Sequence, residues 1–377
     1  MARCRARYSS PVASPVDLAS LPLDALTSFI TGLGEKPFRA KQLYKWLHQR
    51  GATSFEEMTD LSKDLRARLA REAVLVAVTR DLEQRSIDGT IKYRWRTHDG
   101  KLIESVYMPS PDRRTLCVST QVGCAMGCRF CATATLGLVR HLAPSEIVAQ
   151  VHAVNRLVRA EEHLETLRPL TNLVFMGMGE PLHNFENVKT ALALLQSAEG
   201  PHFSSRHITV STVGLVSMIE RFATETDVKL AISLNASSDE VRDRIMPVNK
   251  RFKIAELMEA VKRFPVKQGR RVTFEYVLMD GVNDTDDDAR RLVSLLAGLP
   301  VKVNLIQYNE NPGLGFLSTR DPRAERFQAL LDEGGVPAFI RANRGRDIAA
   351  ACGQLANVGA GNTLNSGGSS PQPPAAT

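Results

Sequence analysis

The spacing of apolar residues changes along the chain from a helical period to a strand period. Residues 16–85 repeat apolar positions at helical spacing, as Leu61, Leu65 and Leu69 do, which predicts amphipathic helices. Residues 86–108 alternate polar and apolar positions around an Asp-Gly turn signal, which predicts paired strands. We therefore expect a small helical accessory domain at 16–85, followed by a β extension at 86–108.

Beyond residue 108, short apolar runs alternate with amphipathic helical segments. The runs are TLCVS, TNLVFM, HITVST, VKLAISL, VTFEYVL and VKVNLIQ, with VPAFI as a seventh candidate. Strands that alternate with helices predict a parallel sheet. We expect an α/β fold over residues 109–355, an incomplete (β/α) barrel, with an open doubly wound sheet as the alternative. In both folds the functional residues gather at the carboxyl ends of the strands.

The two ends of the chain differ from the rest in composition. Residues 1–15 predict a disordered leader, and residues 356–377, which contain no charged residue, predict a disordered tail. No run approaches the ~20 apolar residues of a membrane span, and no apolar stretch follows the N-terminal arginines as it would in a secretory signal. We expect a monomeric, cytoplasmic protein without a membrane partner.

The charge balance is basic, with 48 Lys and Arg against 41 Asp and Glu, a net charge of +7. Lys and Arg neutralise phosphates, so this balance is compatible with a nucleic-acid partner. It is equally compatible with an enzyme whose basic residues are simply solvated. Charge alone therefore leaves both interpretations open.

The six cysteines are unevenly distributed. Cys124, Cys128 and Cys131 lie within eight residues, just after the first strand of the expected barrel, while Cys117 and Cys352 stand apart. A disulfide scaffold would spread its cysteines through a short secreted chain, so metal ligation is the better interpretation. Three thiolates in one loop can bind three irons of a cuboidal cluster and leave the fourth iron open. A zinc site completed by a distant His or Cys is the alternative.

Small and polar residues follow the next strands. The turn GMGEP contains Gly179 and Glu180, and Ser211 and Ser233 each end a strand. Glycines let a backbone approach a ligand closely, and a carboxylate can accept hydrogen bonds from an ammonium group. By themselves such residues are more often structural turns and helix caps.

The loop CxxxCxxC, with Phe130 before its last cysteine, resembles the radical S-adenosylmethionine superfamily. That resemblance implies a [4Fe-4S] cluster whose open iron is chelated by S-adenosylmethionine. The segments GEKPFRAKQLYKWLHQRG, CVSTQVGCAMGCRFCAT, GMGEPLHNFENV and RANRGRDIAAACGQL further resemble the RlmN/Cfr family of RNA methyltransferases, from about residue 17 to 355. GMGEP is similar to the GGEP-like cofactor motif of the superfamily.

The resemblance implies roles for residues that patterns alone leave undecided. Cys352 would accept a methyl group as S-methylcysteine, Cys117 would release the product through a disulfide with Cys352, and Glu104 would accept the proton. The cofactor contacts implied are Gly179, Glu180, Ser211, Ser233, Leu234, Asn235 and Asn309. The family usually has Ser-Leu-His where this chain has Ser233-Leu234-Asn235.

The same resemblance implies a substrate and a product. It implies methylation of carbon 2 of an adenosine in 23S rRNA and in tRNA, with base flipping, and an electron donor such as flavodoxin. The basic helical module and the arginines at 320, 323, 326, 341, 344 and 346 are candidate RNA contacts. C8 methylation of 23S rRNA is the alternative within the family. A zinc-stabilised RNA-binding module without catalysis is the alternative outside it.

Overall fold

The computed structural model describes residues 15–266 and 271–356. The expected leader at 1–15 and tail at 356–377 lie outside the described residues, except for Pro15 and Ala356. Within the described ranges no helix is both long and apolar enough to cross a membrane.

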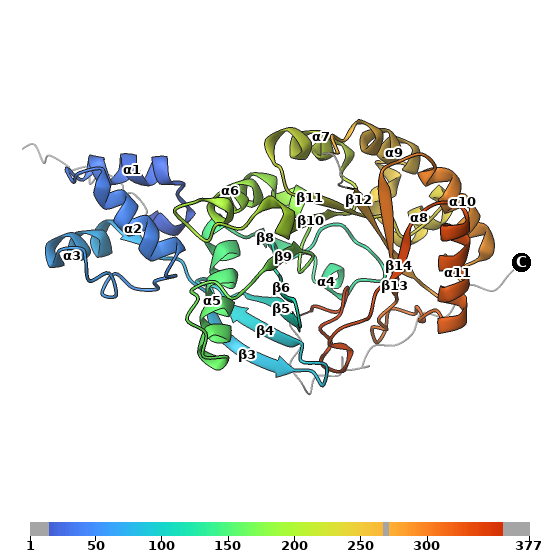
Figure 1. Cartoon of the computed structure of the whole chain (residues 1–377), viewed down its shortest axis with the longest axis horizontal. Coiled ribbons are helices and arrows are strands. Elements are labelled where there is room, and N and C mark those ends of the chain that lie inside the picture. The colour runs from blue at the N-terminus through green and yellow to red at the C-terminus, as the bar shows by residue number, and fades with distance from the viewer. Residues whose placement is uncertain (1–14, 267–270, 357–377) are drawn as a thin grey trace, which may run out of the picture.

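The N-terminal part is a compact group of helices beside the larger domain (Figure 1). Its helices are α1 (Leu23–Gly32), α2 (Phe38–His48) and α3 (Lys63–Glu72). The hydroxyl of Ser62 caps α3 by accepting a hydrogen bond from the Leu65 amide. Two short parallel strands, β1 (Val16–Asp17) and β2 (Ala73–Val74), join the two ends of this module.

A ten-stranded sheet forms the larger domain, in the order β14-β13-β12-β11-β10-β9-β6-β5-β4-β3. Its parallel strands are β6 (Arg113–Cys117), β9 (Asn172–Phe175), β10 (Ile208–Thr212), β11 (Lys229–Ser233), β12 (Val272–Leu278), β13 (Val301–Gln307) and β14 (Ala338–Ile340). These are the apolar runs read from the sequence, so the predicted incomplete barrel is confirmed. β14 and β3 stand at the two edges of the sheet, so the barrel does not close.

An antiparallel extension continues the sheet beyond β6. It consists of β5 (Leu102–Ser110), β4 (Ile91–Arg96) and β3 (Thr79–Arg85). The strand β3 lies in a stretch that the sequence pattern had placed with the helices, and that part of the prediction is wrong. The stretch is an edge strand without a buried side chain, so it lacks the alternation that identifies a half-buried strand.

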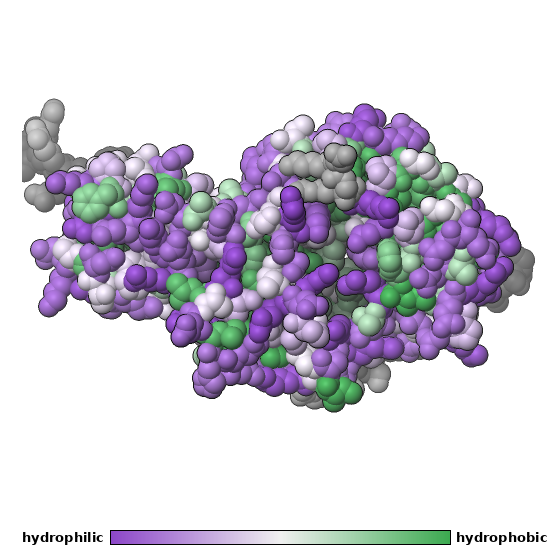
Figure 2. All heavy atoms as spheres, viewed as in Figure 1, coloured by the Kyte–Doolittle hydropathy of each residue, from purple (hydrophilic) through white to green (hydrophobic). Residues whose placement is uncertain are grey.

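Helices pack around the sheet between successive strands (Figure 1). They are α5 (Pro144–Glu161), α6 (Phe185–Gln196), α7 (Val216–Glu225), α8 (Asp239–Ile245), α9 (Ile254–Arg263), α10 (Asp286–Leu296) and α11 (Asp321–Glu333). Short 3-10 turns are η1 (Leu18–Ser20), η2 (Pro181–Asn184), η3 (Ser205–His207), η4 (Pro247–Lys250) and η5 (Arg346–Ile348). Figure 2 shows a mostly hydrophilic face that is hollowed in the middle of this domain. Because the strands are parallel, the loops at their carboxyl ends meet at one edge.

Candidate active site

The cysteine loop is carried by a two-stranded ribbon, β7 (Gln121–Gly123) and β8 (Leu138–His141). Between the two strands lies the short helix α4 (Ala132–Thr135). The amide of Cys124 donates to the carbonyl of Gly137 at 2.8 Å, which closes the base of the loop. Gly123 has φ +75°, and a Cβ there would lie 1.8 Å from the Gly137 oxygen. Only glycine therefore allows the loop to start as it does.

The three thiols suit a cluster better than a single ion. Cys128 is buried and Cys124 and Cys131 are half-buried. A tetrahedral ion with Zn–S bonds of about 2.3 Å needs thiols roughly 3.8 Å apart. Within the part of the chain that the structure describes, the three sulfur atoms do not all lie within 4.8 Å of one another. Burial, with smaller contributions from Glu180 and Cys131, raises the pKa of Cys124 to about 12. A cationic centre would favour the thiolates, so the donor set fits an iron–sulfur cluster.

The carboxylate of Glu180 lies beside the cysteine loop, after β9. It is buried and accepts hydrogen bonds from the amides of Leu182 at 3.0 Å and Val213 at 2.9 Å. Burial raises the pKa of Glu180 to about 7 even though these hydrogen bonds oppose the shift. A bound ammonium group would offset the cost of burying the charged carboxylate.

The glycines of the GMGEP turn allow it to pack closely against the segment that contains Val118 and Gln121. A Cβ on Gly179 would lie 2.6 Å from the Cβ of Gln121, and one on Gly177 would lie 2.7 Å from the Val118 carbonyl oxygen. The turn therefore presses against the segment that leads into the cysteine loop. Any larger residue at these positions would push Glu180 away from the thiols.

The predicted serines lie side by side at the ends of β10 and β11. The hydroxyl oxygens of Ser211 and Ser233 are 3.4 Å apart. The next residue, Leu234, is fully buried. The structure thus brings both hydroxyls to the edge that carries Glu180, whose carboxylate bonds to the loop just after Ser211.

Asn235 has structural bonds of its own. Its backbone is left-handed, with φ +56°, a conformation that Asn tolerates better than most residues. Its Oδ1 accepts from the Val277 amide at 2.9 Å, and its Nδ2 donates to the Met246 sulfur at 3.3 Å. The side-chain amide at 235 therefore joins the ends of β11 and β12.

Asn309, a predicted cofactor contact just beyond β13, has a side-chain oxygen that accepts no hydrogen bond from the described residues. Its side chain is buried, and its Oδ1 has no hydrogen-bond partner among the described residues. A buried acceptor without a partner is costly. A ligand with a donor group would satisfy it, so this residue also fits a bound cofactor.

Cys352, the most distant cysteine in sequence, lies against the cysteine loop. The Ala132 amide donates to the Gly353 carbonyl at 2.7 Å. The Nδ2 of Asn311 donates to the carbonyls of Phe130 at 3.3 Å and Gly353 at 3.2 Å. One amide side chain therefore holds the two loops together.

The thiols of Cys117 and Cys352 are close enough to influence each other. Cys117 ends β6 and is buried, and burial and then the neighbouring Cys352 raise its pKa. Cys352 is exposed as a residue, yet the surrounding protein desolvates its thiol and raises its pKa to about 11. Within that shift, Glu275 contributes to the increase in pKa and Arg341 opposes it. Both cysteines are free thiols in this structure.

Glu104 is fully buried on β5, behind the chain that follows Cys352. One carboxylate oxygen accepts from the Ala356 amide at 3.0 Å, and the other lies 3.7 Å from the ammonium of Lys92. Lys92 is also buried and donates to the Ala349 carbonyl at 3.1 Å. The two side chains therefore bind the Cys352 segment, residues 349–356, at both of its ends.

Sequence analysis missed three residues of this arrangement. They are Lys92, Glu275 and Asn311. Charged residues inside the apolar strand patterns IKYRW and VTFEYVL were the available signal for the first two. No pattern distinguishes Asn311, because its role depends on a contact between two distant loops.

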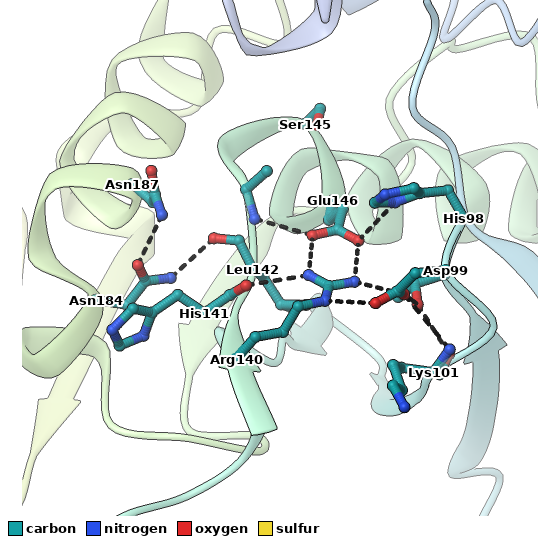
Figure 3. A network of polar contacts seen from close by, with 12 residues as sticks. His98, Asp99, Lys101, Arg140, His141, Leu142, Ser145, Glu146, Asn184 and Asn187 are labelled. Atoms are coloured by element: carbon teal, nitrogen blue, oxygen red, sulfur yellow. Dashed lines mark hydrogen bonds and ion pairs between the residues drawn. The ribbon is translucent and has the colours of Figure 1, made fainter. Parts of the chain in front are cut away.

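A cluster of ionisable side chains next to β8 resembles a metal site but is held by an arginine instead. His98, Asp99 and Glu146 place ligand atoms within 4.8 Å of one another. Figure 3 shows the Arg140 guanidinium between the two carboxylates. It donates to Asp99 at 2.8 Å and to Glu146 at 2.7 and 2.8 Å. The arginine supplies the positive charge that a cation would bring, and it ties β8 to α5.

The predicted RNA-contacting arginines divide into two groups. Arg323 and Arg326 bind Asp286 on the outer helices. Arg344 donates to the carbonyls of Asp88 and Pro109, at 3.4 Å in each case, close to the Cys352 segment. The structure therefore brings only part of this set towards the site.

Comparisons with known proteins agree with this arrangement. The N-terminal domain model of ribosomal RNA large subunit methyltransferase RlmN matches residues 16–75, and the radical SAM superfamily model matches residues 118–293. The chain is 70% identical over 345 residues to dual-specificity RNA methyltransferase RlmN 2 of Myxococcus xanthus, covering 91% of both chains. It is 61% identical to the Anaeromyxobacter dehalogenans RlmN, covering 91% of this chain and 92% of the relative.

A solved structure agrees as well. A crystal structure of a radical SAM methyltransferase from Sphaerobacter thermophilus matches with a TM-score of 0.86 and 47% identity, covering 90% of this chain and 99% of that one. Because the two family models match both domains and a relative is 70% identical over 91% of the chain, the chain belongs to the RlmN family of radical SAM RNA methyltransferases.

Proposed function

We propose that this protein methylates carbon 2 of an adenosine in 23S rRNA and in tRNA, with Cys352 as the methyl-carrying residue. The observation that carries the proposal is the contact between the Cys352 segment and the cysteine loop, made by Ala132 and Asn311. A carrier thiol is useful only if its methyl group lies near the place where a radical is generated. The relatives named for dual-specificity RNA methylation support the choice of substrates.

The metal and cofactor would be held by residues at the carboxyl edge of the sheet. Cys124, Cys128 and Cys131 would ligate a [4Fe-4S] cluster. S-adenosylmethionine would be bound by Gly179, Glu180, Ser211, Ser233, Leu234, Asn235 and Asn309. When bound, the two groups supply a methyl group and a carbon-centred radical. Among these contacts, the side-chain amide of Asn235 is already committed to the chain, so we assign its cofactor contact to the backbone.

Three residues of the chain act on the transferred carbon. Cys352 accepts the methyl group and presents it to the adenine base. Glu104 accepts the proton of the ring carbon, and its burial beside Lys92 holds its carboxylate in place. Cys117 then forms a disulfide with Cys352, which breaks the bond between the Cys352 sulfur and the product.

The partners follow from this chemistry. The RNA would be bound by the helical module and by exposed arginines, with the adenine flipped out of its stack. We propose a flavodoxin-type electron donor, and a monomer that works in the cytoplasm.

Mass spectrometry of RNA digests tests the product. We expect 2-methyladenosine after anaerobic reaction, and exclusive 8-methyladenosine would overturn the C2 assignment. Iron analysis tests the cluster, with about four irons per chain expected for a cubane. A colourless protein that contains zinc would instead support an RNA-binding module without catalysis.

The variant Cys117→Ala tests the division of labour between the thiols. Without the releasing thiol we expect RNA to remain covalently attached through Cys352 after denaturing purification. The double variant Cys117→Ala/Cys352→Ala is the control and should retain no RNA. Absence of RNA from the single variant would contradict the assigned roles.

A further inference from the structure

A groove of about 510 Å³ adjoins the cysteine loop. Its walls are the first turns of α6 and α7, the Arg251–Phe252 segment after η4, and Met126 of the cysteine loop itself. The Cys352 segment contacts the same loop directly, since the Gly353 carbonyl accepts from the Ala132 amide, and Asn311 bridges Gly353 to Phe130. The groove therefore borders the site without containing any residue assigned above.

Two imidazole rings in the groove are fixed in one tautomer. The Oε1 of Gln121 accepts from the Glu180 amide at 2.8 Å, so the other end of that side chain must be the NH₂ group. This group lies 2.9 Å from Nδ1 of His141 and 3.2 Å from Nδ1 of His183. Because it can only donate, both Nδ1 atoms accept, and the neutral rings must carry their protons on Nε2.

Both histidines are exposed and line the groove. Each ring therefore offers an Nε2–H donor on the side opposite to Gln121. Two neighbouring donors held by one amide form a recognition element for an acceptor-rich ligand. Burial and then the neighbouring His183 lower the pKa of His141, which favours the neutral form of that ring.

The charges around the groove favour an anion. Arg251 is exposed, stacks 5.2 Å from the Phe252 ring, and has no ion pair in the described part of the chain. The acidic Glu186 is already paired with Arg221 at 2.6 Å and with Lys189 at 3.0 Å. The positive ends of the α6 and α7 dipoles lie at the groove as well.

We propose that this groove binds a backbone phosphate of the substrate RNA, on a nucleotide close to the target adenosine. The inference rests on the proposed function, and it adds a contact that positions the RNA beside the cysteine loop. A phosphodiester offers the acceptor oxygens that Nε2–H groups and a guanidinium recognise. A concave groove lined by two imidazoles and a guanidinium suits a nucleic-acid strand better than the flat face of a protein partner.

Arg251→Met and His183→Phe test the groove, with Arg113→Met as the matched control. Arg113 is an exposed arginine at the start of β6, at the end of that strand away from Cys117. RNA dissociation constants are measured at several salt concentrations on the full protein carrying its cluster. We expect about fivefold to tenfold weaker binding for Arg251→Met, and a salt slope reduced by about 0.7 to 0.9, as for one lost phosphate contact. The control should retain both wild-type values.

A conservative replacement separates donation from packing. His183→Gln keeps an N–H donor, so it should recover most of the RNA affinity that His183→Phe loses. Methylation of Cys352, read by mass spectrometry without RNA, should be the same in every variant. Wild-type affinity and salt slope in Arg251→Met would overturn the proposal.

Two further outcomes are distinct. If Arg251→Met weakened the binding of inorganic phosphate but left RNA binding unchanged, the groove would serve a free phosphate compound and the proposal would be wrong. If wild-type RNA binding depended on Arg251 but no methylated adenosine formed, the groove would stand and the proposed function would fail.

Discussion

The cysteine loop and the Cys352 segment are built in opposite ways. The loop contains three thiols in eight consecutive residues, closed by the β7–β8 ribbon and by the local backbone contact of Gly123. The Cys352 segment has almost no regular structure, and contacts from β4, β5, α4 and the chain after β13 hold it. A metal site can be specified by local spacing, whereas a carrier thiol must be positioned by the rest of the fold.

The largest effects are expected when one thiol is replaced in the cysteine loop or in the Cys352 segment. The iron content of the two variants distinguishes the roles of the two regions. Cys128→Ala and Cys352→Ala should both abolish methylation of adenosine. Cys128→Ala should also lose most of its iron, because two thiols cannot hold the cluster in place. Cys352→Ala should keep about four irons per chain. Iron and absorbance measurements on anaerobic protein check this, and loss of the cluster in Cys352→Ala would contradict the separation.

The next largest effect is expected at the buried ion pair of Lys92 and Glu104, which binds the Cys352 segment. Lys92→Met removes the cation 3.7 Å from the Glu104 carboxylate, and breaking a buried pair costs about 3–5 kcal/mol of stability. We expect a large loss of stability in denaturant unfolding. The double variant Lys92→Met/Glu104→Gln should recover much of the stability but not the activity. Wild-type stability in Lys92→Met would show that the pair does not hold the segment.

A smaller effect is expected at the contact between the two regions. Asn311→Ala removes hydrogen bonds to the Phe130 and Gly353 carbonyls, each worth about 1 kcal/mol. Methyl transfer from Cys352 to RNA should slow by about tenfold in single-turnover assays, with the iron content unchanged. Gln328→Ala removes a comparable amide-to-carbonyl bond on the outer side of the barrel, to Ala338, and should not slow transfer. Equal rates in the two variants would mean that Asn311 has no positioning role.

The smallest effect is expected where the helical module packs against α5. His48 of α2 and His152 of α5 are buried with ring centroids 6.0 Å apart. Burial lowers the pKa of His152 from 6.5 to about 3 and that of His48 well below 6.5. A histidine with a lowered folded-state pKa contributes stability above pH 6.5 that is lost as the pH falls towards the folded-state value.

The free energy of unfolding should therefore fall between pH 6.5 and 5 by roughly 1 kcal/mol per pH unit for each histidine, and the melting temperature should fall with it. His48→Leu should flatten this dependence, while His207→Gln, at an exposed position, should leave it unchanged. An unaltered pH profile in His48→Leu would show that His48 does not titrate on unfolding in this range.

Sequence patterns were sufficient for the regular parts of the molecule. Seven apolar runs predicted the seven parallel strands, because buried parallel strands must be apolar on both faces. The edge strand at 79–85 was missed, because a strand without buried positions has no hydrophobic alternation. The spacing of Cys124, Cys128 and Cys131 was informative for a similar reason, since one loop supplies all three thiols.

The residues proposed to act in methyl transfer were identified first by the family resemblance, and their positions were then given by the structure. Cys117, Glu104 and Cys352 are separated by up to 248 positions in the printed sequence, and by pattern alone each is an ordinary buried or surface residue. Lys92 and Asn311 had no assigned role until the fold placed them beside the Cys352 segment. The RNA groove could not be anticipated either, because the tautomers of His141 and His183 depend on how Gln121 is turned.

The sequence by itself predicted N-terminal helices, a succession of parallel strands and a loop with three closely spaced thiols, because these depend on short-range spacing and periodic burial. Only the tertiary structure decided that Cys352 lies against that loop, that Lys92 faces Glu104, and that a donor-lined groove adjoins Met126. Such contacts join residues that are distant in sequence, and they exist only when the whole sheet brings its loops to one edge.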